Sequence, residues 1–406
     1  MGYAVQPSAW VANLLRERRR DLKFTLRDVE TKAKAMGDLI PFTLVARVEK
    51  GLVDPGFRRM NLLLRIYQLP TQTAADLADL EQLGGDLPVN PEGTYEEGIE
   101  AWKSGDLRKG MAYLLALAKK DSGDRLSRQK AVLGLAVAAA GMSKYHLALH
   151  ILEQLLLEPP EPTLLLNVLL QAGACWHRRG SLEMAVALFD RAEGYAKTPK
   201  EHAWICHNRA AMFVTFRDFS AAERELGRAL DFYRAAKDTS NESRARGVLV
   251  RLNVERGDLE SALSAARDAQ SYAEKHGHGR LLIMRRIDEG GILHRMGATA
   301  AAIPILQDAL GRATSAQDDV CQFHAHYHLW KAFAAQGETA RANFELNSAQ
   351  FHLRSLDETT SEAEEVRDSM GGMRKRRSEK VAPILAPIPS NRPGGRGKPL
   401  KRRSRR

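Results

Sequence analysis

The chain has 406 residues, of which 44% are hydrophobic and 27% charged, and its formal net charge is +11. Its three cysteines, Cys175, Cys206 and Cys321, lie far apart without Cys-x-x-Cys spacing, which argues against a disulfide scaffold and for a reducing compartment. The N-terminus carries no apolar signal segment, and no run reaches the roughly 18 apolar residues that a membrane span requires. The sequence therefore predicts a soluble cytoplasmic protein.

The positive charge is concentrated at the two ends of the chain. Residues 1–70 hold 13 Lys and Arg against 7 Asp and Glu, and residues 374–406 hold 13 against 1. The stretch 71–373 holds 35 against 42 and is therefore acidic. This pattern predicts that affinity for polyanions is confined to the ends and that the middle has a different task.

A first short helix is predicted after Thr25, which is a helix N-cap candidate. An apolar face follows at Leu26, Val29 and Ala33, at the spacing of an amphipathic helix. A turn at residues 37–38, within a loop that spans about 34–38, breaks this helix.

A second short helix is predicted from about Pro41 to Lys50. Pro41 suits the first helical turn, where its missing N–H has no partner to lose, and Gly51 suits a left-handed stop. The apolar pattern sorts the helix into buried Leu44, Val45 and Val48, and outward-facing Phe42, Thr43 and Arg47. Two short helices joined by a turn form a helix-turn-helix unit, whose second helix enters the DNA major groove.

Residues 8–70 resemble the DNA-binding domains of the phage-repressor (XRE) type. The resemblance is carried by the opening helix around residues 14–19, by Phe24-Thr25, by the run 47–51, and by Asp54-Pro55 with a closing helix at 58–69. The chain departs from this family in a longer turn between the two central helices, and in Leu26, where the family commonly has a phosphate-contacting Gln.

The resemblance implies roles for seven residues. Arg19 and Glu49 are expected to form a partly buried ion pair that ties the first helix to the end of the recognition helix. The remaining roles are base contacts by Phe42, Thr43 and Arg47, and phosphate contacts by Arg27 and Lys50. The alternatives are core packing for Phe42 and a solvated surface charge for Arg47.

A linker helix at 74–83 and a loop at 84–93 are predicted to lead to a repeat array at 94–370. Its clearest unit places small residues at Gly173, Ala185 and Ala192, an aromatic residue at Phe189 and a turn at Gly180. Helix corners recur at 180, 217, 257, 297 and 337, with earlier ones near 105 and 141. The units resemble tetratricopeptide (TPR) repeats, so seven helix pairs stacked into an α-solenoid are expected, each pair about a turn longer than usual. The alternative is a generic helical bundle with alanine-rich interfaces.

The first helix of each TPR pair lines the concave groove, and the polar residues expected there could grip an extended peptide. These candidates are Asn167, His177, Trp204, His207, Arg244, Arg251, His294, His324, Tyr327 and Lys331. The architecture is similar to bacterial regulators that join an XRE domain to TPR repeats, dimerise, and sense small signalling peptides. For each residue the alternative is an ordinary polar position on a solenoid face.

Neither a metal site nor a catalytic site is predicted. His324 and His328 are four residues apart on an expected helix and could share an ion, but His326 points to the other side, and no acidic partner lies one turn away. P-loop, GxSxG and strand-borne GxGxxG motifs are lacking, so neither an enzyme nor a cofactor is expected. The tail at 371–406, rich in Arg, Lys, Pro and Gly and without aromatic residues, is expected to be disordered and to add nonspecific phosphate contacts, or only solubility.

The sequence thus predicts an all-α, cytoplasmic transcriptional regulator that binds double-stranded DNA as a homodimer and receives a peptide or protein ligand in its TPR groove. Two alternatives stay open: a TPR interaction scaffold whose helix-turn-helix does not read DNA, and an RNA-associated protein that uses the basic tail.

Overall fold

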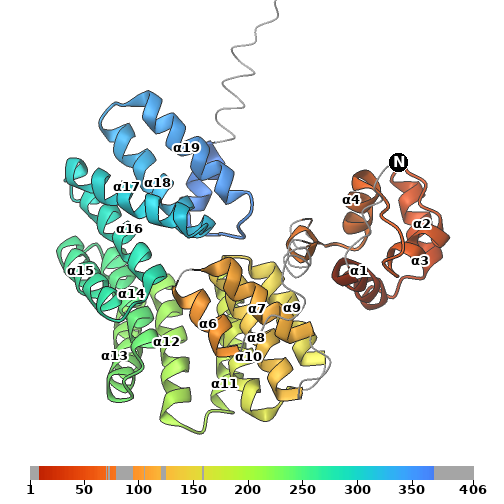
Figure 1. Cartoon of the computed structure of the whole chain (residues 1–406), viewed down its shortest axis with the longest axis horizontal. Helices are drawn as coiled ribbons and strands as arrows, with labels where there is room; N and C mark the ends of the chain where they lie inside the picture. The colour runs from red at the N-terminus through yellow and green to blue at the C-terminus, as the bar shows by residue number, and fades with distance from the viewer. Residues whose placement is uncertain are drawn as a thin grey trace, which may run out of the picture.

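The computed structural model describes residues 9–69, 71, 74–78, 95–104, 106–119, 125–157 and 160–369. Every regular element in these ranges is a helix, and the helices follow one another as packed pairs (Figure 1). The all-α fold class is therefore confirmed. Across the same ranges, no helix combines the length and hydropathy needed to cross a membrane.

Four short helices form the N-terminal bundle, which lies to one side of the larger array in Figure 1. Their bounds are α1 Ala9–Asp21, α2 Leu26–Ala35, α3 Phe42–Val48 and α4 Phe57–Ile66. The N-cap predicted at Thr25 is confirmed, because its hydroxyl accepts a hydrogen bond from the Asp28 amide while the Asp28 carboxylate accepts one from the Thr25 amide. This reciprocal arrangement satisfies two free donors at the start of α2.

Three details of the predicted second helix were wrong. Pro41 is the N-cap, with φ −58° and ψ 143°, and not a residue of the first helical turn. The helix ends at Val48, before Lys50, and Leu44 is only partly buried. The separation between the two helices is residues 36–41, slightly later than the predicted turn, because helical hydrogen bonding continues through Ala35.

The rest of the described chain is a solenoid of seven helix pairs. Their bounds are α6 Tyr95–Ser104 with α7 Leu107–Lys119, α8 Arg125–Gly141 with α9 Tyr145–Leu157, α10 Pro162–Arg178 with α11 Leu182–Glu193, α12 Pro199–Thr215 with α13 Phe219–Ala235, α14 Thr239–Arg256 with α15 Leu259–Lys275, α16 Gly279–Arg295 with α17 Thr299–Ser315, and α18 Asp319–Ala335 with α19 Thr339–Leu353. A further helical stretch at 361–369 follows the last pair. The predicted stack of TPR-like helix pairs is confirmed, and the 17-residue helices of the middle pairs explain the corner spacing of about 40 residues.

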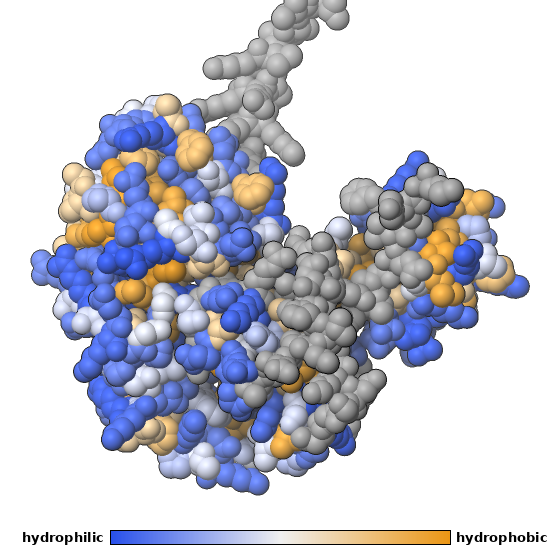
Figure 2. All heavy atoms as spheres, in the orientation of Figure 1, coloured by the Kyte–Doolittle hydropathy of each residue, from blue (hydrophilic) through white to orange (hydrophobic). Residues whose placement is uncertain are grey.

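Small residues let the helices of each pair pack closely. A methyl group at Gly173 would lie 2.6 Å from Cε1 of the buried Phe189, and one at Gly290 would lie 2.5 Å from Leu306 Cγ. At the corners, Gly180 and its counterparts adopt a positive φ, while Arg217 takes the same role with φ +60°. Hydrophilic side chains cover much of the visible outer face of the array, with smaller hydrophobic areas among them (Figure 2).

The solenoid closes on itself near its first helix. Trp102 of α6 packs against Gly141 at the end of α8, and the guanidinium groups of Arg244 and Arg280 lie 5.4 and 5.9 Å from its ring centroid. Arg280 also donates a 2.5 Å hydrogen bond to the Gly141 carbonyl. Residues far apart in the sequence therefore meet across the inside of the array.

The segment after α19 makes a second closing contact. The Asp357 amide donates to the Ser143 carbonyl, and the Asp357 carboxylate accepts from the His146 amide, each at 2.8 Å. The Thr359 hydroxyl donates to the Arg178 carbonyl at the end of α10. Because the α8–α9 corner and α10 belong to early repeats, this segment fastens the late end of the solenoid to the early end.

Two predicted regions lie mostly outside the described residues. Of the linker at 71–93, residue 71 and residues 74–78 are helical, and Asp76 forms a buried ion pair with Lys144 of the array. The loop at 84–93 and the basic tail at 371–406 are outside the described ranges.

Candidate nucleic-acid interface and repeat groove

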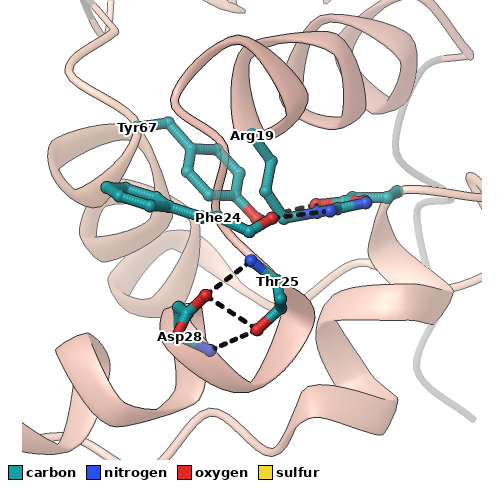
Figure 3. Close-up of polar contacts among 6 residues, drawn as sticks. Arg19, Phe24, Thr25, Asp28 and Tyr67 are labelled. Atoms are coloured by element: carbon teal, nitrogen blue, oxygen red, sulfur yellow. Dashed lines mark hydrogen bonds and ion pairs between the residues drawn. The ribbon is translucent and has the colours of Figure 1, made fainter.

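The ion pair predicted between Arg19 and Glu49 is present. Figure 3 shows the Arg19 side chain beside Phe24 and Tyr67, together with the capping contacts of Thr25 and Asp28. Arg19 Nε lies 2.8 and 3.0 Å from the two Glu49 carboxylate oxygens, and Nη2 lies 2.8 Å from Oε2. Arg19 Nη1 also donates to the Phe24 carbonyl at 2.9 Å, which fixes the corner before α2. Hydrogen bonding to Glu49 raises the pKa of Arg19 and keeps the guanidinium charged.

Tyr67 is a third member of this network that sequence reasoning missed. Its hydroxyl donates a 2.7 Å hydrogen bond to Glu49 Oε1, and its ring is fully buried. Burial, first, and then the Glu49 charge raise the pKa of Tyr67 far above its ordinary value, so the phenol stays protonated. Glu49 caps α3, so this network fixes the end of α3 against α1 and the C-terminus of α4.

The outward face of α3 carries the three predicted base-contacting side chains. Phe42, Thr43 and Arg47 are exposed, and Phe42 has 39% of its surface accessible. On the opposite face, Val45 and Val48 are completely buried. The alternative of core packing for Phe42 does not hold, since this ring is open to solvent. The Phe42 ring instead lies beside the guanidinium group of Arg27.

The two predicted phosphate-contacting residues flank this face. The Arg27 guanidinium, at the start of α2, lies 5.6 Å from the Phe42 ring centroid, and Lys50 is exposed just beyond the end of α3. Glu30 accepts a 3.3 Å hydrogen bond from the Phe42 amide and therefore occupies the N-terminus of α3. An acidic group therefore already binds one of the free amides at the start of α3.

All ten predicted groove residues lie on the first helix of their pair, but they differ in accessibility. His177 is buried and shares a 2.8 Å hydrogen bond with the Thr215 hydroxyl, while Trp204 packs into the hydrophobic core between repeats. Tyr327 and Lys331 both bind Glu365, at 2.7 and 2.6 Å. The stretch 361–369 therefore binds both side chains, although Lys331 remains partly exposed. Apart from the buried His177, all of these residues are partly exposed, and those without the contacts named above are Asn167, His207, Arg244, Arg251, His294 and His324.

Burial and neighbouring positive charges lower the pKa of several histidines and arginines on the first helices of the pairs. Burial, together with neighbouring arginines, lowers the pKa of His177 to about 3 and that of His207 to about 4. Burial, then the charges of Arg178 and Arg285, lowers the pKa of Arg251 to about 10.

The histidines at 324, 326 and 328 and the three cysteines form no metal site among the described residues. His326 is buried and shares a 2.5 Å hydrogen bond with Glu345 Oε2, stacked on His352, and no group of three metal-ligating side chains gathers within the described ranges. The three cysteines are buried, and burial raises the pKa of each thiol.

The described helices define the class of protein: an all-α protein in which a small helix-turn-helix bundle precedes a TPR-like solenoid. No known family profile matches the sequence, and no curated protein sequence matches it significantly.

Among solved structures, the chain is similar to a signal-transduction ATPase with a tetratricopeptide repeat sensor from Pyrococcus horikoshii, at 14% identity and a TM-score of 0.43. The likeness covers 86% of this chain but only 62% of the ATPase. It is also similar to PlcR of Bacillus thuringiensis, whose structure was solved with the peptide PapR7 and DNA, at 12% identity and a TM-score of 0.30. That likeness covers 78% of this chain and 99% of PlcR. Both scores lie below 0.5, and no property of either protein follows for this chain.

Proposed function

We propose that the chain is a transcriptional regulator, without enzymatic activity, that reads double-stranded DNA through α3. The observation that carries the proposal is the outward face of this helix. Phe42, Thr43 and Arg47 are exposed there, while Val45 and Val48 on the other face hold the helix in the core. The Arg19–Glu49–Tyr67 network adds rigidity, as a reading surface requires side chains held in a fixed frame.

Each exposed residue of α3 has a chemistry suited to a base edge. Arg47 can donate two hydrogen bonds to guanine O6 and N7, and Phe42 or the Thr43 methyl can contact a thymine methyl. Arg27 and Lys50 supply positive charge for phosphates on either side. The excess of basic residues in 1–70 favours approach to DNA. A homodimer would read two half-sites about one helical turn apart.

The repeat array would supply the regulatory input, by dimerising and by binding a peptide or protein signal in its groove. Two contacts connect the array to the DNA-reading end. Gln154 of α9 donates a 2.9 Å hydrogen bond to Glu17 of α1, and Lys144 pairs with the buried Asp76. A ligand that changes the curvature of the solenoid would thereby alter the spacing of the two α3 helices in the dimer.

The test is a selection of bound sequences from a random duplex library by the full chain at physiological ionic strength. The affinity for the selected duplex and for a shuffled duplex is then measured by fluorescence anisotropy. Arg47→Ala should weaken binding to the selected duplex by about 1–3 kcal/mol, roughly 5- to 150-fold, with little effect on the shuffled one. Arg224→Ala, at an exposed position of α13, is the charge-matched control.

Equal weak binding of both duplexes, unchanged by Arg47→Ala, would contradict base reading and favour the interaction-scaffold alternative. The chain truncated after residue 373 tests the RNA-associated alternative. Sequence-blind, salt-sensitive binding that disappears with the tail would support that alternative.

A further inference from the structure

Three arginines lie in a row on the inner side of the middle repeats. Arg244, Gly247 and Arg251 occupy one face of α14, at the helical spacing i, i+3 and i+7. Arg285 of α16 lays its guanidinium group over Gly247, since a methyl group there would lie 2.1 Å from Arg285 Nη1 and 2.7 Å from Cζ. The Arg285 guanidinium therefore sits between the two arginines of α14.

This row faces the interior of the closed solenoid. Arg251 Nη2 donates a 2.7 Å hydrogen bond to the Ala211 carbonyl of α12, the preceding first helix. At the other end, Arg244 lies over Trp102 of α6, which approaches from the opposite side of the closure. Solvent still reaches the row, because Arg244 and Arg251 are only partly buried.

The acidic side chains near the row do not pair with it one to one: Asp288 forms an ion pair with Arg285, whereas Asp238 and Glu255 lie near Arg244 and Arg251 without forming one. Arg285 is 7% exposed, and its Nε and Nη1 groups make no hydrogen bond, although Nη1 lies 3.2 Å from Asp288 Oδ2. Arg251 Nε is likewise buried without a hydrogen bond. Arg244 makes no ion pair with any described residue. Buried guanidinium donors without acceptors are costly, so an acceptor supplied from outside the chain would stabilise the site.

We infer that this row, Arg244, Arg285 and Arg251, is an anion-binding subsite that selects an acidic peptide as the ligand of the array. The inference rests on the proposed role of the groove and names the chemistry of its ligand. Carboxylates fit because guanidinium groups bind them through paired hydrogen bonds. The closure by Trp102 and by the segment after α19 favours a slender extended chain over a folded partner domain.

The spacing of the row sets the spacing of the ligand's acidic groups. Arg244 and Arg251 are seven residues apart, which corresponds to about 10 Å along the helix axis. A peptide in the extended polyproline-II conformation advances about 3.1 Å per residue with three residues per turn, so carboxylates three positions apart lie on one face and span about the same distance. One of them can be a C-terminal carboxylate.

The experiment incubates the full chain with an equimolar random hexapeptide library at physiological ionic strength and identifies retained peptides by mass spectrometry after ultrafiltration. Retained peptides should be enriched in pairs of acidic groups about three positions apart. Retention of these peptides should fall about tenfold or more in the double variant Arg244→Gln/Arg251→Gln. Arg224→Gln/Arg228→Gln, two exposed arginines of α13, is the control with the same change in charge and should retain them as the natural chain does.

A second measurement does not depend on the folding of the variant. The best retained peptide and its twin with Gln in place of Glu and Asn in place of Asp are titrated into the natural chain, and the twin should bind at least about tenfold more weakly. Retention without acidic enrichment, equal binding of both twins, or no retained peptide at all would overturn the inference. None of these results would affect the DNA selection, so a failure here and a failure of DNA reading are distinguishable.

Discussion

The Tyr67 hydroxyl donates a 2.7 Å hydrogen bond to Glu49, the same carboxylate that binds Arg19. This one acceptor therefore joins the end of α4, the end of α3 and the end of α1. The Glu49 side chain is only 4% exposed, so loss of the Arg19 donor or of the Tyr67 donor leaves a buried charge with fewer partners. The relationship explains how a seven-residue helix can hold a fixed outward face.

Tyr67→Phe should destabilise the N-terminal bundle by about 1.5–3 kcal/mol, because it removes one hydrogen bond to a buried charge and leaves the ring in place. Amide hydrogen exchange of α3 in the full chain measures this local free energy. Tyr195→Phe, at a tyrosine that is 41% exposed, is the matched control and should leave exchange unchanged. Unaltered protection of α3 in Tyr67→Phe would show that the hydroxyl does not stabilise the helix.

Two glycines in the array should respond in opposite directions to alanine. Gly173→Ala places a methyl group 2.6 Å from the Phe189 ring, so the free energy of unfolding should fall by about 1–3 kcal/mol. Gly227→Ala, inside α13, meets no atom within 4 Å and should stabilise the chain by about 0.5–1 kcal/mol. Urea unfolding compares the two variants, and shifts of the same sign would contradict the packing described at Gly173.

His177 should make the protein less stable in mild acid. Its pKa is lowered to about 3 in the folded chain, so it stays neutral there, whereas in the unfolded chain it takes up a proton near pH 6.5. The unfolded state binds more protons in this window, so stability is full above pH 6.5 and falls as the pH drops toward 3. At pH 5 the loss from this group should be about 2 kcal/mol.

His177→Gln tests this pH dependence, because Gln cannot titrate and can still hydrogen-bond the Thr215 hydroxyl. Urea unfolding at pH 7 and pH 5 should show a smaller loss in the variant than in the natural chain. The same difference between the two pH values in both proteins would rule out a contribution from His177.

The closing segment should protect the α8–α9 corner from exchange. Asp357→Ala removes the carboxylate that accepts a 2.8 Å hydrogen bond from the His146 amide. Hydrogen exchange at that corner should accelerate by about tenfold, in line with one lost hydrogen bond to a charged group. Asp368→Ala, at an exposed position of the last helical stretch, is the control and should leave the corner as protected as in the natural chain. Equal exchange in both variants would show that the solenoid is not fastened by Asp357.

The sequence by itself determined the local features of this protein. Thr25 with Asp28 specifies the start of α2, because a capping box depends on residues three positions apart. The recurring glycines and alanines specify the corners and close contacts of the repeats, because each helix pair repeats the same packing problem. The ion pair between Arg19 and Glu49 could be predicted only from the family resemblance.

The tertiary structure alone decided which distant side chains meet. Nothing in the local pattern around Tyr67 marks it as a partner of Glu49, and the contact of Trp102 with Arg244 depends on the accumulated curvature of the repeats. Glu365, on the helical stretch that follows α19, binds Tyr327 and Lys331 of α18, so the partner of these two predicted groove residues comes from a neighbouring helix of the array. Small rotations between neighbouring pairs add up along a solenoid, so its closure is a property of the whole array and cannot be seen in any single repeat.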